Sequence, residues 1–121
     1  MNFLEKMGMK TAMKRLQDSG VAPSGEIPID FDSGATPGNV NGQVILLLTD
    51  RALYLGSHNA AGGKRLDLSS IGGINIEVFG KAVHYVVFEK SNNIWADVTF
   101  PSGRKSFNAQ VHRLKQNLGK D

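Results

Sequence analysis

The sequence predicts a mainly β fold, an antiparallel barrel or sandwich of seven strands closed by a C-terminal amphipathic helix, with an additional helix at the N-terminus. Five apolar residues at 44–48 precede the turn residues Thr49-Asp50-Arg51, and a second apolar segment follows at 52–55. A run this short between turn residues is typical of a buried strand, so residues 43–57 form a predicted hairpin. Near the end of the chain, apolar residues spaced by four, three and four positions predict one helical face: Phe107, Val111, Leu114 and Leu118.

The other strands are predicted from alternation and from glycine-rich turns. In the first of them Ile27, Ile29 and Phe31 are expected to point inward, and Glu26, Asp30 and Asp32 outward. Pro28 predicts that this is an edge strand. The predicted strands outside the hairpin cover residues 26–32, 64–68, 74–78, 83–90 and 94–100.

The two ends of the chain are expected to be helical. Residues 1–20 form a predicted N-terminal extension to a domain of residues 21–121. Its helix is expected over about 9–18, packing through Met9, Ala12, Met13 and Leu16, because Gly8 costs about 1 kcal/mol inside a helix. Whether residues 104–108 extend the sheet or begin the last helix, with Ser106 as its N-cap, stays open at this point.

The composition excludes several classes of protein. The net charge is +3, with basic ends and a mildly acidic middle, and this layout argues against nucleic-acid binding by the strands. The chain has no cysteine and no apolar run near the roughly 18 residues of a spanning helix, so we expect a cytoplasmic protein that is soluble or peripheral to a membrane. The histidines are scattered, and no metal, cofactor or catalytic motif is present, so we expect no enzyme.

Two segments resemble a known superfold. Residues 48–55, LTDRALYL, and 65–71, RLDLSSI, are similar to segments of bacterial PH-like and GRAM-like domains of the pleckstrin-homology superfold. The resemblance covers about residues 25–119 and implies a bent barrel closed by the last helix. The superfold hosts lipid-binding, peptide-binding and scaffold roles, so the resemblance does not choose among them. Residues 26–43 contain no Lys or Arg, which predicts no specific phosphoinositide binding there.

The candidate sites are therefore binding surfaces. Phe3, Leu4 and Met7 form an apolar set on the side of the N-terminal segment away from the packing face. Trp95 either anchors a partner from the outer face of the last strand or packs beneath a helix. The residues expected to meet a membrane or an acidic partner are Lys6, Lys10, Lys14, Arg113 and Lys115.

The predicted function is that of a non-enzymatic binding module. The leading hypothesis is interaction with a protein partner or self-association. The alternative is peripheral binding to an anionic membrane surface through the basic N- and C-terminal helices.

Overall fold

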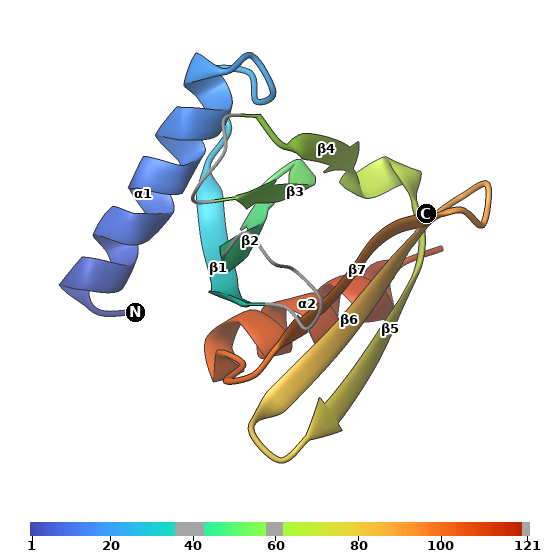
Figure 1. Cartoon of the computed structure of the whole chain (residues 1–121). Coiled ribbons are helices and arrows are strands. Elements are labelled where there is room, and N and C mark those ends of the chain that lie inside the picture. Colours follow the sequence, from blue (N-terminus) through green and yellow to red (C-terminus); the bar gives the residue numbers. More distant parts are fainter. Residues whose placement is uncertain (36–42, 58–61, 120–121) are drawn as a thin grey trace.

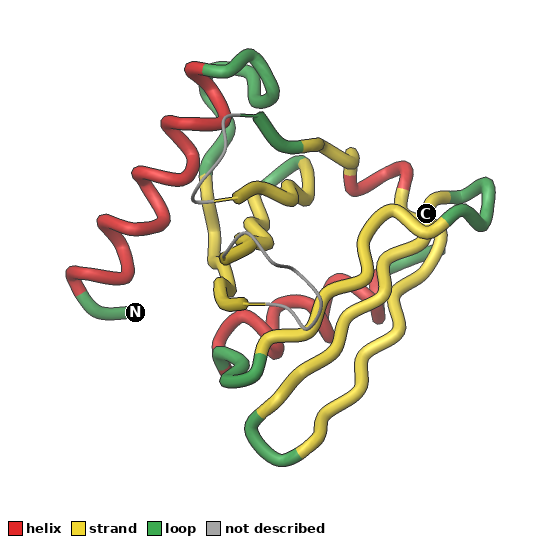
Figure 2. The backbone as a smooth tube through the Cα atoms, in the orientation of Figure 1, coloured by secondary structure: helices red, strands yellow, loops and turns green. Residues whose placement is uncertain are grey.

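The computed structural model describes residues 1–35, 43–57 and 62–119. Two helices flank seven strands in chain order, and a short 3-10 helix, Leu68–Ser70, follows the fourth strand (Figures 1 and 2). The elements are α1 (Phe3–Asp18), β1 (Pro28–Ala35), β2 (Gln43–Thr49), β3 (Ala52–Ser57), β4 (Lys64–Asp67), β5 (Ile71–Phe79), β6 (Ala82–Glu89), β7 (Ile94–Phe100) and α2 (Lys105–Asn117).

The strands form two antiparallel sheets and not the closed barrel expected from the sequence. Sheet 1 has the order β1-β2-β3-β4, and sheet 2 has the order β5-β6-β7. The continuous ladder ends at the 3-10 helix between β4 and β5, where the chain turns from one sheet into the other (Figure 1). The mainly β meander with two helices is confirmed.

Strand β2 is buried on both faces. Leu46 and Leu48 belong to the core between the two sheets, whereas Ile45 and Leu47 belong to a second core under α1. Alternate residues of a strand point to opposite faces, so an unbroken apolar run is what a doubly covered strand requires. Figure 1 shows α1 alongside the outer face of sheet 1.

Helix α1 begins earlier than the sequence indicated. It starts at Phe3, its N-cap Asn2 accepts a hydrogen bond from the amide of Glu5 at 2.9 Å, and it continues through Gly8 to Asp18. The interruption expected at Gly8 is therefore wrong, since one glycine weakens a helix without ending it. The expected packing face is confirmed: Met9, Ala12, Met13 and Leu16 are all buried.

The expected orientation of β1 is also wrong. Asp30 and Asp32 point inward and are buried, and so is Glu26 just before the strand, whereas Ile27 and Ile29 are exposed. Ile29 is an extra residue opposite the step from Thr49 to Leu48, which makes a bulge. The acidic side chains are buried because each one has hydrogen-bond donors inside, as described below.

A bulge also decides where Trp95 lies. Val87 pairs with Ala96, and Phe88 pairs with Ile94, so Trp95 is the extra residue in β7. Such a bulge breaks the strict alternation of side chains, and Trp95 and Ala96 are both buried while Ile94 is exposed. The alternation in 94–100 predicts that Ile94 shares a face with Ala96, Val98 and Phe100, and the bulge makes that prediction wrong for Ile94.

Helix α2 begins directly after Arg104, so residues 104–108 do not extend the sheet. Its N-cap is Arg104, and the alternative of Ser106 as N-cap is wrong. Phe107 and Val111 are fully buried in the core between the sheets, and Leu114 and Leu118 are partly buried against it. The ring of Phe107 meets that of Tyr85 edge to face, with 5.7 Å between the centroids.

The apolar residues of α2 should therefore contribute unequally to the free energy of unfolding. We expect Phe107→Ala to lower the free energy of unfolding by about 3–5 kcal/mol, and Leu114→Ala to lower it by less than about 2 kcal/mol, because Leu114 keeps part of its surface in water. Urea titration followed by the fluorescence of the buried Trp95 measures both. Equal losses for the two variants would show that the end of α2 is as deeply packed as its start.

Candidate functional site

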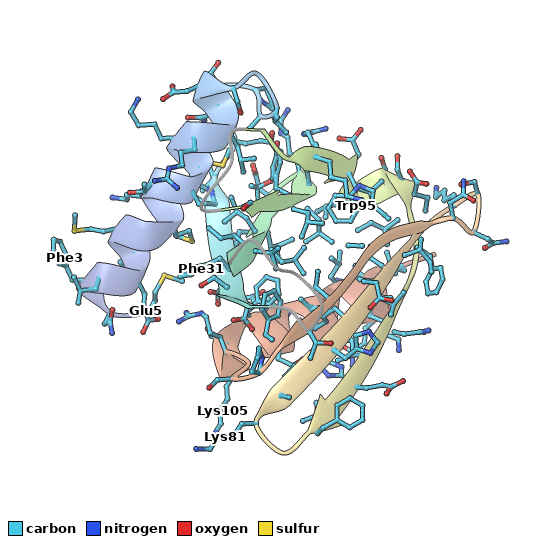
Figure 3. The ribbon with its side chains drawn as sticks, viewed as in Figure 1. Phe3, Glu5, Phe31, Lys81, Trp95 and Lys105 are labelled. Carbon is cyan, nitrogen blue, oxygen red and sulfur yellow. The ribbon has the colours of Figure 1, made fainter. Side chains whose placement is uncertain are left out.

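The N-terminal end of α1 carries an exposed apolar surface, which we call the α1 tip: Phe3, Leu4 and Met7. Their side chains are 74%, 77% and 50% exposed. They lie on the side of the helix opposite its buried face, and Figure 3 shows Phe3 projecting away from the molecule. The structure therefore places these three residues together, as the spacing predicted.

The basic candidates of α1 lie next to this tip and further along the helix. Lys6 and Lys10 are exposed on the first turns of the helix. Lys14 is exposed too, but its ammonium group lies 3.1 Å from the Asp18 carboxylate, so its charge is partly compensated. Exposed pairs of this kind contribute little to stability.

The basic candidates of α2, Arg113 and Lys115, are exposed on the second helix. Figure 1 shows α2 behind sheet 2 and α1 outside sheet 1. The five cationic candidates therefore do not form one continuous site.

Trp95 is not an exposed anchor. It is 5% exposed and belongs to the core between the sheets, with the Lys64 ammonium 5.0 Å from its ring centroid. The Lys64 ammonium also donates a hydrogen bond to the Trp95 carbonyl. Trp95 is therefore a buried packing residue, as the second alternative had it, but its place is the core between the sheets and its ring neighbour is Lys64 of β4.

A buried polar cluster surrounds Glu26. Its carboxylate accepts hydrogen bonds from Tyr54 Oη at 2.5 Å, from Thr49 Oγ1 at 2.8 Å and from Arg65 Nη2 at 3.3 Å. Arg65 Nε donates to Tyr54 Oη at 2.8 Å, so the four side chains form one network. The cluster fastens the segment before β1 to strands β2, β3 and β4.

The same network makes the β2–β3 turn. Thr49 Oγ1 accepts from the amides of Arg51 and Ala52 at 3.1 and 3.0 Å. Asp50 accepts from the amide of Ile27 at 3.0 Å, and its own amide donates to the Ile27 carbonyl. The turn is therefore tied to the segment that leads into β1.

The pKa values of the Glu26 cluster depend on the balance between burial and hydrogen bonding. Burial alone would raise the pKa of Glu26, but the donors Tyr54, Thr49 and Arg65 outweigh it and lower that pKa below 4.5. Burial, together with the neighbouring carboxylate of Glu26, raises the pKa of Tyr54 to about 12. Glu26 is thus held ionised, and Tyr54 stays a neutral donor.

Arg104 is the centre of a second polar cluster, which joins three elements. Its guanidinium pairs with Glu5 of α1 and lies 3.3 Å from Asp30 of β1. It stacks over the Phe31 ring at 4.7 Å from the centroid, and Nε donates to the Phe31 carbonyl at 2.8 Å. The backbone amide of Arg104 donates to Asp32 at 2.9 Å. One residue at the start of α2 therefore holds α1 and β1.

In this second cluster the surroundings favour the charged form of Arg104 and disfavour the charged form of Asp32. Burial raises the pKa of Asp32, and the backbone hydrogen bonds from Arg104 and Ser33 offset this only in part. Burial alone would lower the pKa of Arg104, but its contacts with Glu5 and Asp30 raise it above its ordinary value. Arg104 is thus a permanent cation.

Among the described residues, few side chains that could carry out catalysis or bind a metal lie close together. In the parts of the chain that the structure describes, no three His, Asp or Glu side chains are grouped so that they could hold a metal ion. His84 and Asp97 share a hydrogen bond of 2.6 Å on the outer face of sheet 2. The sequence missed both polar clusters, because their members lie up to 99 residues apart.

Known proteins resemble this chain in structure. No model of a protein family matches it, and no curated protein does. One similar structure is the C-terminal domain of an unknown protein from Leishmania infantum, with a TM-score of 0.56 and 19% identity over 88% of this chain and 94% of that one. Another is the hSac2 domain of the human phosphoinositide phosphatase Sac2, with a TM-score of 0.53 and 16% identity over 100% of this chain and 87% of that one.

These likenesses bear on the fold alone. Two antiparallel sheets with two helices give a β-sandwich shape compatible with a PH-like fold. Of the described helices, neither has the length and apolar character needed to cross a membrane.

The Glu26 cluster predicts a pH-dependent stability. Because the folded pKa of Glu26 is lowered, its contribution is complete above the unfolded value of 4.5 and is lost as the pH falls through the folded value. At pH 7 we expect Glu26→Gln to lower the free energy of unfolding by about 1–3 kcal/mol. Urea titrations from pH 7 to pH 3 should show the gap from wild type narrowing as the pH falls. A gap of constant size would mean that the charge of Glu26 contributes nothing.

The geometry of the Arg104 cluster predicts that a positive charge at residue 104 is not sufficient for the stability of wild type. Arg104→Lys keeps a cation but cannot reach Glu5, Asp30 and the Phe31 carbonyl together, so we expect a loss of about 1–3 kcal/mol in the free energy of unfolding. The exposed Arg113→Lys is the matched control and should change it by less than about 0.5 kcal/mol. Similar effects of the two substitutions would contradict the role of the Arg104 fork.

Proposed function

We propose that the protein is a non-enzymatic binding module and that the α1 tip docks it on another protein chain, either a partner or a second copy. The observation that carries the proposal is the exposure of Phe3, Leu4 and Met7 on one end of a helix whose other face is buried. A contiguous exposed apolar surface is a common mark of an interaction site.

The position of the tip on a fixed helix supports this function. The next turns of α1 are anchored by their buried face, and Glu5 within the tip pairs with Arg104. Binding would therefore order few backbone degrees of freedom, which keeps the entropic cost of association low. Fully burying one such side chain is worth about 1.5–3 kcal/mol, so three of them are enough for a specific contact.

A second candidate function is peripheral binding to an anionic membrane. The observation that favours it is the exposure of Lys6 and Lys10 next to the α1 tip, since apolar and cationic side chains together suit the membrane interface. In that case the α1 tip would enter the interface in place of a protein pocket.

The remaining features of the proposal come from the sequence. The LTDRALYL segment, residues 48–55, supports membership of the bacterial GRAM-like branch of the PH-like proteins. A cytoplasmic location, the lack of a cofactor, the lack of catalysis and the lack of specific phosphoinositide binding belong to the same proposal. Part of the loop on which the phosphoinositide prediction depends, residues 36–42, lies outside the described residues.

The test replaces the α1 tip without disturbing the helix. A triple variant, Phe3→Gln, Leu4→Gln and Met7→Gln, keeps good helix formers and leaves Asn2 and Glu5 in place. We expect its stability to stay within about 1 kcal/mol of wild type. Sedimentation analysis over a range of concentrations should show a lower apparent mass, or affinity capture from the native cell should lose a partner that wild type retains.

The control uses an exposed apolar residue elsewhere. Ile94→Gln changes a side chain that is 58% exposed at the end of β7, and it should leave both readouts as in wild type. If the triple variant keeps the mass and the partners of wild type, the α1 tip is not the docking element. If Ile94→Gln has the same effect as the triple variant, general loss of apolar surface explains the result.

A further inference from the structure

Two exposed apolar side chains lie at the end of the β5–β6 hairpin, away from α1, and as neighbours in a regular strand they point to opposite faces of its tip. Val78 and Phe79 are 57% and 58% exposed, and the turn continues through Gly80, whose φ is +61°, to Lys81. Figure 1 shows this turn as a protruding end of sheet 2, apart from the N-terminal end of α1. We call residues 78–81 the hairpin tip.

The hairpin tip is braced by the segment that leads into α2. The amide of Gly103 donates to the Lys81 carbonyl at 2.9 Å. A Cβ on Gly103 would lie 2.3 Å from a methyl group of Val83, so this close approach depends on glycine. The tip therefore projects on a support of fixed shape.

Two exposed lysines lie near the two apolar side chains. Lys81 and Lys105 are exposed, and Figure 3 shows both at the same end of the molecule. Arg104, next to Lys105, is occupied by its contacts with Glu5 and Asp30. Glu77 is the exposed acidic residue of this hairpin end, and it lies across from His84 on β6. Lys81 of the hairpin tip and Lys105 at the start of α2 are thus the exposed cations at this end, against one exposed carboxylate, that of Glu77.

We propose that the hairpin tip is a contact site for an anionic membrane surface. Val78 and Phe79 enter the boundary between headgroups and acyl chains, and Lys81 and Lys105 meet the lipid phosphates. Aromatic and aliphatic side chains flanked by lysines suit this interface. A fluid bilayer deforms around a convex tip, whereas a protein would need a matching pocket. In a symmetric contact with a second copy, the lysines of both copies would face each other, which disfavours self-association here.

The inference goes beyond the proposed docking of the α1 tip and does not depend on it. The two surfaces lie on different elements, so a molecule could use one to hold a protein and the other to approach a membrane. Separate variants can therefore test each surface in the same full-length chain.

The experiment measures co-sedimentation with vesicles of phosphatidylcholine alone and of phosphatidylcholine with phosphatidylserine, at low and at high salt. We expect binding to the anionic vesicles that weakens with salt. The double variant Lys81→Gln and Lys105→Gln should lose about thirtyfold in affinity, and Val78→Ser with Phe79→Ser about tenfold or more. Lys90→Gln is the matched control, an exposed lysine in the turn at the other end of β6, and it should bind like wild type.

The possible results separate this site from the α1 tip. Loss of vesicle binding in the hairpin variants, with the mass and partners of wild type retained, supports the proposal. Loss only in the α1 triple variant assigns membrane binding to α1 and overturns it. Equal binding to neutral vesicles, no binding by wild type, or a change of apparent mass in the hairpin variants also overturns it. Thermal unfolding confirms that each variant is folded.

Discussion

The structure depends on covering β2 on both faces. Without the second sheet, Leu46 and Leu48 would be exposed to water, and without α1, Ile45 and Leu47 would be. Burial of these apolar side chains on both faces of β2 stabilises the folded state. The 3-10 helix after β4 brings sheet 2 over one face, and Met13 and Leu16 of α1 cover the other. The N-terminal helix is thus a third layer of the fold, and its free end is available for binding because the rest of it is held.

Local pattern in the sequence was enough to place the strands and the two helices. The apolar run at 44–48, the alternation in β6 and the stripe from Phe107 to Leu118 each reflect a burial that the structure shows. The exposure of the α1 tip also followed from helical spacing. These features depend on neighbours within a few residues, so a periodic pattern records them.

Long-range pairing accounts for what the sequence did not predict. The acidic face of β1 is buried because its partners, Arg65 for Glu26 and Arg104 for Asp30, lie 39 and 74 residues away. A carboxylate with such partners can face inward, while an alternation rule places it outside. Trp95 was uncertain for a related reason, since one bulged residue reverses the facing of its neighbours.

The inward acidic face of β1 has a further consequence for the behaviour of the protein at high concentration. An edge strand with free amides can recruit another chain and begin aggregation. On β1, Pro28 offers no amide hydrogen, the bulge at Ile29 interrupts the flat edge, and the buried charges of Asp30 and Asp32 oppose any slip in register. The exposed Ile29 of β1, and Ile27 just before the strand, therefore lie at an edge that is a poor template for intermolecular sheet growth.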